Sequence, residues 1–311
     1  MHVVVIGAGA VGGYFGARLA QNGIPVTFLV RERRRQQLAE RGLRVRSIHG
    51  DIQLSPQLAV RPEDIANPGL VLLAVKQYHL EGALPQVQAL AKQGAYVLPL
   101  LNGIRHLDAL RSVMPPRQLL GGLCHIEATL DQSGDVIHTS QLHDITYGPL
   151  AETDARDLPA IDETLQGRGF IARRSEQVLV DMWIKYICLS TLSGLTASTR
   201  KPIGAVRDDG PASRLMRQFA AEAAAVARAE CPEVPSDAAD QAVRWLERLP
   251  ASMTASMHRD LEKGLPIEIE SIQGVLVELA ERHGIDTPAI RALYAILHPH
   301  RDGAREPLRQ A

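Results

Sequence analysis

The chain has 311 residues, of which 45% are hydrophobic and 22% are charged, and its formal net charge is −1. This composition is typical of a globular protein, and the length is sufficient for two domains of ordinary size. A nearly neutral charge gives no general attraction to polyanions, and only 4% of the residues are aromatic. Neither nucleic acid nor an anionic membrane surface is therefore an expected partner.

The cysteines and the hydrophobic segments indicate a cytoplasmic protein. Cys124, Cys188 and Cys231 stand far apart and form no C-x-x-C pair, so we expect three buried thiols in a reducing compartment. No uninterrupted apolar run reaches the ~18 residues that a membrane span needs. The first residues lack the basic start of a signal peptide.

The first half of the chain alternates between strand-like and helix-like segments. Residues 3–6 form a short, wholly apolar, β-branched run, as expected for a strand that is buried on both faces. A helix is expected from about Gly12 to Asn22, with Gly23 as the residue that ends it. This alternation predicts right-handed βαβ units and a parallel sheet with helices on both faces. Later strands are expected at residues 26–30, 69–75 and 95–100, and 121–148 is a candidate antiparallel edge of the first domain.

From about residue 175 the pattern becomes helical. Helical periodicity covers residues 178–199, 214–230, 236–249 and 268–283, and Ser236-Asp237 is the expected capping pair of the third segment. The tail from Pro299 to Ala311 is polar, and we expect it to be frayed. The predicted fold is an α/β Rossmann domain with a doubly wound parallel sheet at residues 1–175, followed by an all-α domain at 176–311.

A glycine motif directly follows the first predicted strand and fits G-x-G-x-x-G. The first glycine allows a tight turn, the second lets a pyrophosphate approach the backbone, and the third lets the helix pack closely on the strand. The free N–H groups and the dipole of the helix would then hold the diphosphate. A purely structural turn is the alternative, but the position between a buried strand and a helix favours dinucleotide binding. The motif comprises Gly7, Ala8, Gly9, Ala10, Val11 and Gly12.

The end of the second predicted strand indicates which dinucleotide is bound. NAD-binding proteins usually place Asp or Glu there, because a carboxylate accepts hydrogen bonds from the ribose 2′-hydroxyl. Residues 30–35 of this chain read VRERRR instead, and the planar, permanently charged guanidinium of Arg31 suits a 2′-phosphate. The alternative is that residues 33–35 lie on a solvated helix face, which we expect of at least one of them. The predicted cofactor is NADPH (NADP+).

The histidines do not indicate a metal. The chain has eleven of them but no H-E-x-x-H motif, and the closest pair, His298 and His300, lies in the polar tail. We therefore expect neither a structural nor a catalytic metal.

Several short motifs follow one another in an order and spacing that is similar to one family. Each motif is short, but their ordered combination is specific, and the resemblance extends from residue 1 to about 298. On this basis the chain resembles the ketopantoate reductases (2-dehydropantoate 2-reductases). The motifs are GAGAVGGYFGARLA, AVKQYHL, LLNGI, DMWIK, SMHRDLEKGLPIEIESIQG and HGIDTP.

The resemblance implies an N-terminal Rossmann domain, a C-terminal helical domain, and an active site in the cleft between them where NADPH reduces a 2-keto acid. Carried over position by position, it implies that Lys185 is the general acid. It also implies that Glu268 is the acidic residue near this lysine, the substrate hydroxyl and the cofactor. Lys76 and Asn102 would contact the cofactor and the substrate, and Ser256 would contact the substrate carboxylate.

The chemistry of hydride transfer requires residues of these types. Reduction of a ketone builds negative charge on the carbonyl oxygen, so the site needs a proton donor or cation there and a further cation or N–H group for the carboxylate. Lys185 has apolar neighbours at residues 182–184, 186 and 187, and a carboxylate such as Glu268 would hold its ammonium in place. The alternative is a helix lysine that extends to solvent.

The other candidates also have alternatives. Lys76 and Asn102 each follow a predicted strand, and ligands of open α/β sheets bind beyond the carboxyl ends of the strands. An ordinary Asn-Gly turn is the alternative for Asn102-Gly103. Glu268 stands near the start of a predicted helix, where a capping carboxylate is the alternative. Ser256 by itself indicates little.

Two positions depart from the pattern of the family. In typical ketopantoate reductases, asparagine follows the lysine at four residues and again at eight, whereas this chain has Leu189 and Ser193. Position 189 lies one helical turn from Lys185 on the same face, so an amide that would meet polar groups of the substrate is replaced by an apolar side chain. Such a loss can change substrate discrimination strongly.

Three functional hypotheses therefore stay open. The first is reduction of 2-dehydropantoate to pantoate on the pathway to pantothenate and coenzyme A. The second is NADPH-dependent reduction of a different small keto acid. The third is a nonenzymatic NADPH-binding sensor, although binding alone would not require both Lys185 and Glu268. A homodimer is also open, because the predicted C-terminal helices have apolar faces.

Overall fold

The computed structural model describes residues 1–304 and divides the chain into two compact units. The first unit comprises Met1–Leu101 and His106–Val178, and the second comprises Asn102–Arg105 and the residues from Leu179 onward. Asn102–Arg105 thus packs with the second unit, although the residues on either side of it in the sequence belong to the first. Each unit has its own cluster of buried apolar side chains.

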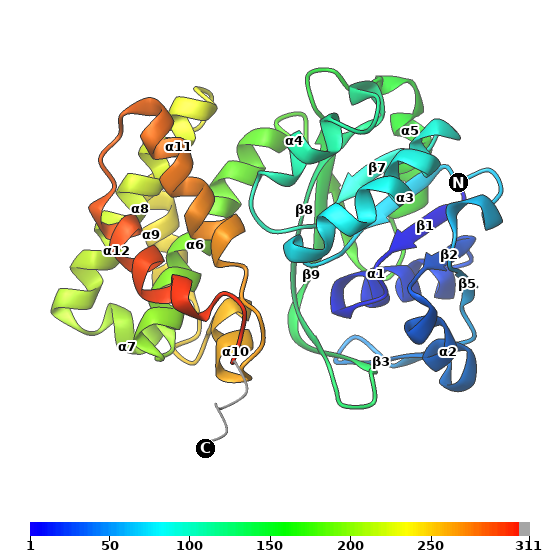
Figure 1. Cartoon of the computed structure of the whole chain (residues 1–311), viewed down its shortest axis with the longest axis horizontal. Coiled ribbons are helices and arrows are strands. Elements are labelled where there is room, and N and C mark those ends of the chain that lie inside the picture. Colours follow the sequence, from blue (N-terminus) through cyan, green and yellow to red (C-terminus); the bar gives the residue numbers. More distant parts are fainter. Residues whose placement is uncertain (305–311) are drawn as a thin grey trace, which may run out of the picture. The chain divides into compact units, whose positions relative to one another are not determined.

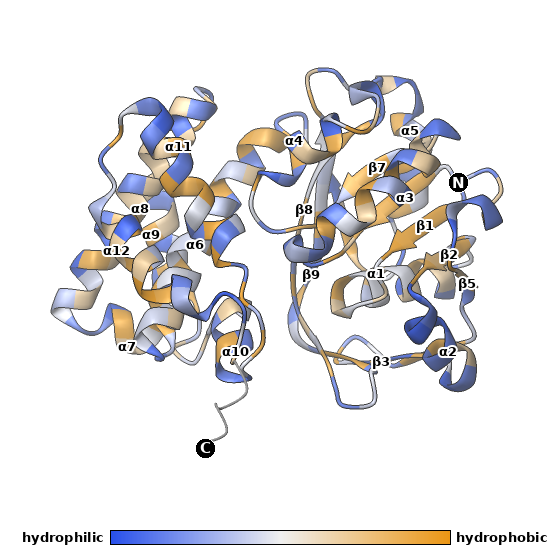
Figure 2. Ribbon diagram, in the orientation of Figure 1, coloured by the Kyte–Doolittle hydropathy of each residue, from blue (hydrophilic) through white to orange (hydrophobic). Residues whose placement is uncertain are grey.

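A parallel sheet forms the centre of the first unit (Figure 1). Its order is β5-β2-β1-β6-β7, so the chain builds outward from β1 to one side and then continues on the other, as predicted for a doubly wound fold. Every residue of β1, β2, β6 and β7 is buried, and Figure 2 shows β1 and β7 as hydrophobic segments. The strands are β1 (Val3–Ile6), β2 (Val26–Leu29), β5 (Gln57–Ala59), β6 (Leu70–Leu73) and β7 (Tyr96–Pro99).

A second sheet contains the long antiparallel pair that the sequence placed at residues 121–148. That segment is antiparallel, but it does not extend the parallel sheet: it joins a separate five-stranded sheet of order β10-β9-β3-β4, with β8 paired to β9. The predicted antiparallel strands are thus present in the first unit. Their place in a separate sheet was not predicted, because pairing between distant short strands has no local sequence signal. These strands are β3 (Leu43–Ser47), β4 (Ile52–Leu54), β8 (Leu120–Leu130), β9 (Val136–Pro149) and β10 (Ile171–Arg174).

Helix α1 (Ala10–Gln21) lies between the two sheets, in contact with β1 and β2 on one side and with β3, β4, β8 and β9 on the other. Small residues allow this approach. A Cβ on Gly16 would lie 2.6 Å from the ring of Phe28, and a Cβ on Gly13 would lie 2.9 Å from Val136. Gly23 follows the helix with a φ of +81°, which confirms its predicted place at the C-terminus.

The remaining helices of the first unit connect its strands. Helix α2 is strongly hydrophilic and follows β2 (Figure 2), whereas α3 buries one apolar face. These helices are α2 (Glu32–Arg41), α3 (Leu80–Lys92), α4 (His106–Arg111) and α5 (Leu158–Leu165), with 3₁₀ turns η1 (Pro62–Asp64), η2 (Gln77–His79), η3 (Pro116–Gln118) and η4 (Ala155–Asp157).

The second unit consists of helices and loops in the part of the chain that the structure describes (Figure 1). Its longer helices direct their apolar faces into one core, where Tyr186, Leu195 and Phe219 are among the buried residues. The all-α prediction for this half is therefore confirmed. The elements are α6 (Val178–Thr199), α7 (Ile203–Arg207), α8 (Gly210–Glu230), α9 (Ala238–Arg248), α10 (Ser256–Glu262), the π-helical turn η5 (Glu270–Gly274), α11 (Val275–His283), α12 (Pro288–Leu297) and η6 (His298–His300).

Two local predictions for this half need correction. Asp237 stands at the N-cap of α9, but its carboxylate accepts hydrogen bonds from the side chains of Gln241 (2.8 Å) and Arg244 (3.1 Å) and makes no side-chain cap. The tail is ordered further than predicted, because the backbone N–H of Ala304 donates to the carbonyl of Gly264 at 2.9 Å. The rest of the predicted frayed tail, residues 305–311, lies outside the described residues.

Helix α6 is long and apolar enough to cross a membrane by length and composition alone. Its most apolar window is 72% buried in the structure, however, and the core helix of a globular unit passes the same test of composition. The burial identifies α6 as a core helix.

Candidate functional site

The glycine-rich turn joins β1 to α1 at the carboxyl end of the parallel sheet. Gly7 has a φ of +97°, and a Cβ there would lie 2.8 Å from the carbonyl oxygen of Ala74, just beyond β6. A Cβ on Gly12 would lie 2.1 Å from the carbonyl oxygen of Gly7. The first position therefore favours glycine through its backbone conformation, and the second through the close approach of the chain.

The start of α1 is suited to an anion. Its N-cap is Gly9, which offers no side-chain cap, and the first turn of the helix contains no acidic residue. A Cβ on Gly9 would meet no atom within 4 Å, so the backbone borders open space there. N–H groups at a helix start carry partial positive charge. The residues present therefore fit the diphosphate of a dinucleotide.

Lys76 lies at the end of the neighbouring strand. Strands β1 and β6 are paired in parallel, and the chain order reverses between them, which is where open α/β sheets bind ligands. Lys76 follows β6 after Ala74 and Val75, is half-buried, and begins the turn η2. The structure thus brings Lys76 to the same edge of the sheet as the glycine-rich turn.

Arg31 is exposed at the end of β2, where it is the N-cap of α2. The acidic residue of this run, Glu32, pairs with Arg35 at 2.6 Å on the surface of the helix, so Arg35 has the solvated position expected of at least one of these arginines. Burial lowers the pKa of His79, and the charge of Arg31 lowers it further. Arg31 and His79 therefore lie close enough to interact, a proximity that no motif in the sequence indicated.

Arg34 faces inward, which the sequence did not predict. Its Nε donates to the carbonyl of Ala8 (3.2 Å), its Nη1 donates to the side chain of Gln37 (2.6 Å), and its Nη2 donates to the carbonyl of Gly134 (3.0 Å). Arg34 thus ties the glycine-rich turn to the tip of the β8–β9 hairpin. A run of four arginines within five residues contains no signal for which of them turns toward the protein.

Lys185 and Asn102 are in contact in the second unit. The Nζ of Lys185 lies 3.4 Å from the Oδ1 of Asn102, and both residues are half-buried. Because an ammonium can only donate, the amide must turn its oxygen toward Lys185 and its Nδ2 donors away from it. The pair therefore offers N–H donors from two side chains, as an oxygen that gains negative charge requires.

Glu268 belongs to the same unit and is only 7% exposed. Its backbone carbonyl accepts a hydrogen bond of 3.1 Å from the hydroxyl of Ser271, and the chain then enters the π-helical turn η5. Turns of this kind are rare and often occur at functional sites. Lys185, Asn102 and Glu268 thus all belong to one compact unit.

Ser256 is the first residue of helix α10, whose start lies beside the C-terminal part of α6. The backbone N–H of the preceding residue, Ala255, donates to the hydroxyl of Thr196 at 3.5 Å. Thr196 lies eleven positions beyond Lys185 in the same helix, or about 16 Å along its axis at the usual helical rise. The start of α10 is therefore well separated from Lys185 along α6.

The two positions that depart from the asparagine pattern have different surroundings. Leu189 is half-buried one turn from Lys185. Ser193 is fully buried, accepts a hydrogen bond from Gln273 Nε2 (3.2 Å) and donates one to the carbonyl of Ser190 (3.3 Å). Ser193 is thus used inside the core, whereas Leu189 keeps part of its surface accessible near the lysine.

Comparison with known proteins finds family matches in both units. The family model "Ketopantoate reductase PanE/ApbA" matches residues 3–152, and "Ketopantoate reductase PanE/ApbA C terminal" matches residues 177–301. "Uncharacterized oxidoreductase YkpB" of Bacillus subtilis (strain 168) is 32% identical over 299 residues, which cover 96% of this chain and 98% of that protein. The chain belongs to the ketopantoate reductase family.

Other relatives place this family member among oxidoreductases that act on keto or hydroxy groups. A 2-dehydropantoate 2-reductase of Caulobacter vibrioides is 28% identical over 298 residues, 95% of this chain and 98% of its own. The solved ternary structure of D-mandelate dehydrogenase with NADH and anilino(oxo)acetate has a TM-score of 0.88 at 24% identity, and the likeness covers 97% of this chain and 98% of that one. At that identity, the likeness concerns the fold.

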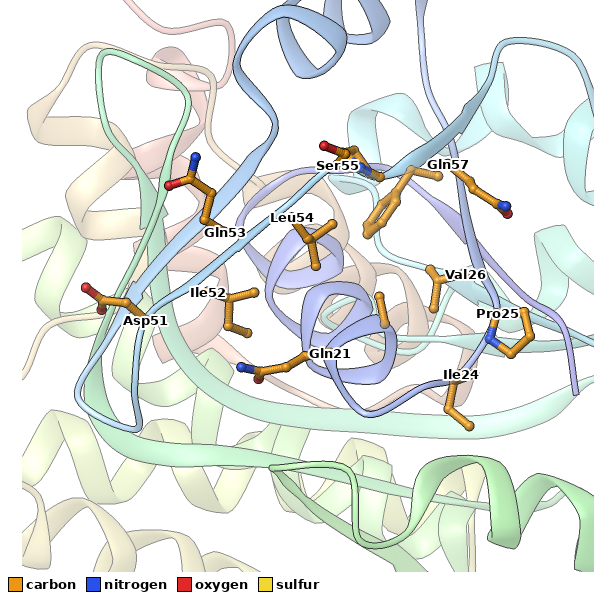
Figure 3. A pocket seen from close by; sticks show the side chains of 13 residues that line it. Gln21, Ile24, Pro25, Val26, Asp51, Ile52, Gln53, Leu54, Ser55 and Gln57 are labelled. Carbon is orange, nitrogen blue, oxygen red and sulfur yellow. The ribbon is translucent and has the colours of Figure 1, made fainter.

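A hollow of about 550 Å³ lies at the other end of α1 from the glycine-rich turn (Figure 3). Gln21, at the C-terminus of the helix, lines it together with apolar residues such as Ile52 and Leu54 and with Gln53 and Gln57 near the rim. Among the described residues that line it there is no lysine, arginine or histidine. The hollow therefore lacks the cations that would bind the carboxylate of the keto acids reduced by this family.

Within residues 1–304, no group of three or more His, Cys, Asp or Glu side chains could hold a metal ion. His49, His138 and His143 do lie together, but their rings are stacked, with 3.8 Å and 6° between His49 and His143. Stacked rings direct their nitrogens along parallel planes and not toward a common point. The three cysteines are free and buried, as predicted.

Proposed function

We propose that this member of the ketopantoate reductase family uses NADPH to reduce 2-dehydropantoate to pantoate, on the pathway to pantothenate and coenzyme A. The contact of Lys185 with Asn102, in the unit that also contains the buried Glu268, is the observation that carries this proposal. The similarity to a 2-dehydropantoate 2-reductase along nearly the whole chain supports it. Residues 1–175 are the proposed NADP-binding domain, and residues 176–311 are the proposed catalytic domain.

The first unit has the proposed cofactor contacts. The backbone from Gly7 to Gly12 would receive the diphosphate, and Arg31 would pair with the 2′-phosphate. Lys76 of the same unit is a proposed further contact to the cofactor, and so are Asn102 and Glu268 of the second unit. When bound, NADPH supplies the hydride.

The second unit has the proposed acid chemistry. Lys185 donates a proton to the carbonyl oxygen of the substrate as negative charge develops there, and solvent later returns a proton to the lysine. Asn102 orients the ammonium through its Oδ1, and its Nδ2 donates to a substrate oxygen. Glu268 contacts the substrate hydroxyl and balances the charge of the lysine. The contact of Ser256 with the substrate carboxylate stays a prediction, which Ser256→Ala would test through KM.

A different small 2-keto acid is the second candidate substrate, and Leu189 is the observation that favours it. Its partly accessible apolar side chain near Lys185 suits a keto acid with an apolar side chain better than a hydroxylated one. The D-mandelate dehydrogenase of similar fold was solved with anilino(oxo)acetate, in which the carbonyl next to the carboxylate bears an anilino group.

The decisive experiment follows NADPH oxidation with 2-dehydropantoate and with 2-keto acids that lack its hydroxyl. A kcat/KM for 2-dehydropantoate at least ~10-fold above the others supports the first substrate, and the reverse order supports the second. Lys185→Ala should lower kcat about 10²- to 10⁴-fold, whereas the exposed Lys201→Ala should not. Tight NADPH binding without turnover of any acid would indicate the nonenzymatic sensor instead.

Cofactor choice has its own test. Arg31→Ala should weaken NADPH binding about 10- to 100-fold, because charge-assisted hydrogen bonds to the 2′-phosphate are lost, and should change NADH binding less than about threefold. Arg33→Ala, at an exposed neighbour, is the matched control. Equal losses for the two dinucleotides would refute the role of Arg31.

A homodimer in the cytoplasm is the proposed state of the protein. The exposed Ile296 of α12 is one apolar side chain that such contacts would cover. Light scattering over a range of concentrations would give the mass, and a monomer at every concentration would contradict the dimer.

A further inference from the structure

Tyr186 follows Lys185 in α6 and points into the core of the second unit, where it is 1% exposed. Its hydroxyl donates to the carbonyl of Ile272 at 2.6 Å and lies 3.4 Å from the carbonyl of Ser271. Burial raises the pKa of this phenol, so the hydroxyl is protonated and acts as a hydrogen-bond donor near neutral pH. A buried phenol therefore connects the helix of Lys185 to the segment that follows Glu268.

The carbonyls that Tyr186 meets belong to the π-helical turn η5. The N–H of Val275 donates to the carbonyl of Glu270, five residues back, whereas an ordinary helix uses four. Where the backbone hydrogen bonds change from a spacing of five residues back to a spacing of four, one backbone carbonyl is skipped and has no N–H partner within the helix. The hydroxyl of Tyr186 supplies a donor at this place, which favours the wide turn over an ordinary helical one.

The loop of Asn102 meets the same turn. Gly103 has a φ of +78°, and a Cβ there would lie 2.8 Å from the carbonyl oxygen of Ser271 and 3.9 Å from the ring of Tyr186. The backbone beside Asn102 is therefore seated directly against the turn. Arg105 of the same loop also forms an ion pair with Glu278 of α11, which holds the loop to the helix that follows the turn.

Three segments thus converge on one phenol: the helix with Lys185, the loop with Asn102, and the chain that leads from Glu268 into η5. We propose that Tyr186 is a positioning residue that holds Asn102 and Glu268 in register with Lys185 for the reduction of the keto acid. This inference rests on the proposed function, because it assigns Tyr186 a role in the same reaction. Tyr186 itself touches neither substrate nor cofactor in this scheme.

Loss of the hydroxyl has a specific structural consequence. Without a donor from Tyr186, the turn would gain by closing to ordinary helical spacing, which rotates the residues on one side by about 100° relative to those on the other. Such a change would move Glu268 and would displace the carbonyl of Ser271 against which Gly103 packs. The aromatic ring at position 186 would still fill the core. Misplacement of reacting groups by about 1 Å can lower a rate 10²-fold.

The test compares Tyr186→Phe with Tyr294→Phe. Tyr294 is a matched control, because its hydroxyl donates to the side chain of Glu270 on the same turn at 2.9 Å and not to the carbonyls of the turn. Tyr186→Phe should lower kcat about 10- to 100-fold with KM changed less than about threefold. It should also shift the pH profile of kcat, because the surroundings of the proton donor change. Tyr294→Phe should do neither.

A second variant approaches the same junction from the loop. Gly103→Ala places a Cβ 2.8 Å from the carbonyl of Ser271 at a positive φ and should reproduce the loss of kcat and the altered pH profile. Wild-type kcat and an unchanged pH profile in folded Tyr186→Phe would overturn the proposal. Equal losses in the two tyrosine variants would overturn it as well, since any lost hydroxyl near the turn would then suffice.

Amide hydrogen exchange of the peptide over residues 268–276 tests the role of Tyr186 independently of the proposed reductase function. Exchange there should become at least about tenfold faster in Tyr186→Phe but not in Tyr294→Phe. If the wild-type protein reduces no keto acid, the proposed function fails, and this measurement alone still decides whether Tyr186 organises the turn. Unchanged exchange in Tyr186→Phe would overturn the structural role even in an active enzyme.

Discussion

The Nζ of Lys185 and the Oδ1 of Asn102 lie 3.4 Å apart, although 83 residues separate them in the sequence. Both residues belong to the second unit, which includes the loop Asn102–Arg105 together with the helices from Leu179 onward. The lysine and the amide are therefore part of one compact unit. This arrangement has consequences for the kinetics of variants.

If Asn102 acts in catalysis through its hydrogen bond with Lys185, Asn102→Ala should lower kcat/KM about 10- to 100-fold, because Lys185 loses the acceptor that orients its ammonium. In a Lys185→Ala background the same change should lower it by no more than about threefold, since groups that act together are not additive. The kcat/KM values of the four proteins provide the measurement. An equally large loss in both backgrounds would show that Asn102 acts independently of the lysine.

Arg34 should support the binding of both dinucleotides. Arg34→Met should weaken NADPH and NADH by similar factors, roughly 10-fold, because the glycine-rich turn that it braces would hold the diphosphate common to both. Gly134→Ala should act similarly from the hairpin, because its Cβ would lie 2.6 Å from Nη1 of Arg34. Calorimetric titration measures both affinities.

The exposed Arg35, which pairs with Glu32, supplies the control for this experiment. Arg35→Met should leave both affinities within about twofold. A loss confined to NADPH in Arg34→Met would show that Arg34 contacts the 2′-phosphate instead of bracing the turn.

The stacked histidines of the first unit should make its stability depend on pH. The ring of His143 stacks on that of His49, and its Nδ1 lies 2.9 Å from the hydroxyl of Tyr14. Burial lowers the pKa of His143 to about 4, and the charges of His49, His138 and Arg18 contribute in the same direction, whereas Asp144 opposes them. The folded state therefore favours the neutral ring.

An unfolded histidine has a pKa of about 6.5, so between this value and about pH 4 the unfolded chain binds a proton that the folded chain does not. The contribution of His143 to stability is complete above about pH 6.5, falls as the pH is lowered through this window, and levels off below it. His143→Gln should reduce the difference in urea midpoint between about pH 7 and about pH 5, whereas His300→Gln, at an exposed residue, should leave it unchanged. An identical difference in His143→Gln would contradict the prediction.

Glu222 should contribute to stability as a cap supplied by another helix. It lies on α8, is 8% exposed, and accepts hydrogen bonds from the N–H groups of Ala289 (3.1 Å) and Ile290 (3.0 Å) at the start of α12. Thr287, the N-cap residue of α12, makes no side-chain cap. Glu222→Ala should lower the free energy of unfolding by about 1–3 kcal/mol, because two buried N–H groups lose their acceptor.

The charge-neutral Glu222→Gln keeps one acceptor oxygen and should lose less stability than Glu222→Ala. Urea unfolding of the three proteins at one pH gives the comparison. Equal losses in the two variants would mean that the charge of Glu222, and not its hydrogen bonds, stabilises α12.

Local pattern was sufficient for much of the fold. The apolar runs at residues 3–6 and 95–100 became buried parallel strands, and the helical periodicity at 178–199 coincides with α6. Such segments are predictable because the side-chain period and the length of the run decide between strand and helix within a few residues. The glycine-rich turn belongs to the same class, since its conformation is required by its own glycines.

Contacts between distant residues were not predictable in this way. The inward turn of Arg34, the seat of Gly103 on Ser271, and the phenol of Tyr186 on η5 each join segments far apart in the chain. The second sheet was missed for the same reason, because each of its short strands depends on a partner that local pattern does not name.

By itself, the amino-acid sequence determined the class of each half, the place of the glycine-rich turn and the identity of the residues proposed for the chemistry. The class of each half and the place of the turn follow from periodicity and from glycine, which act over short stretches of chain. The residues proposed for the chemistry follow from the resemblance of the ordered motifs to the ketopantoate reductases. The tertiary structure alone decided which arginine turns inward, that Asn102 packs with Lys185, and how the turn after Glu268 is held. Those outcomes depend on packing and on the pairing of buried polar groups, which are settled only when distant segments meet.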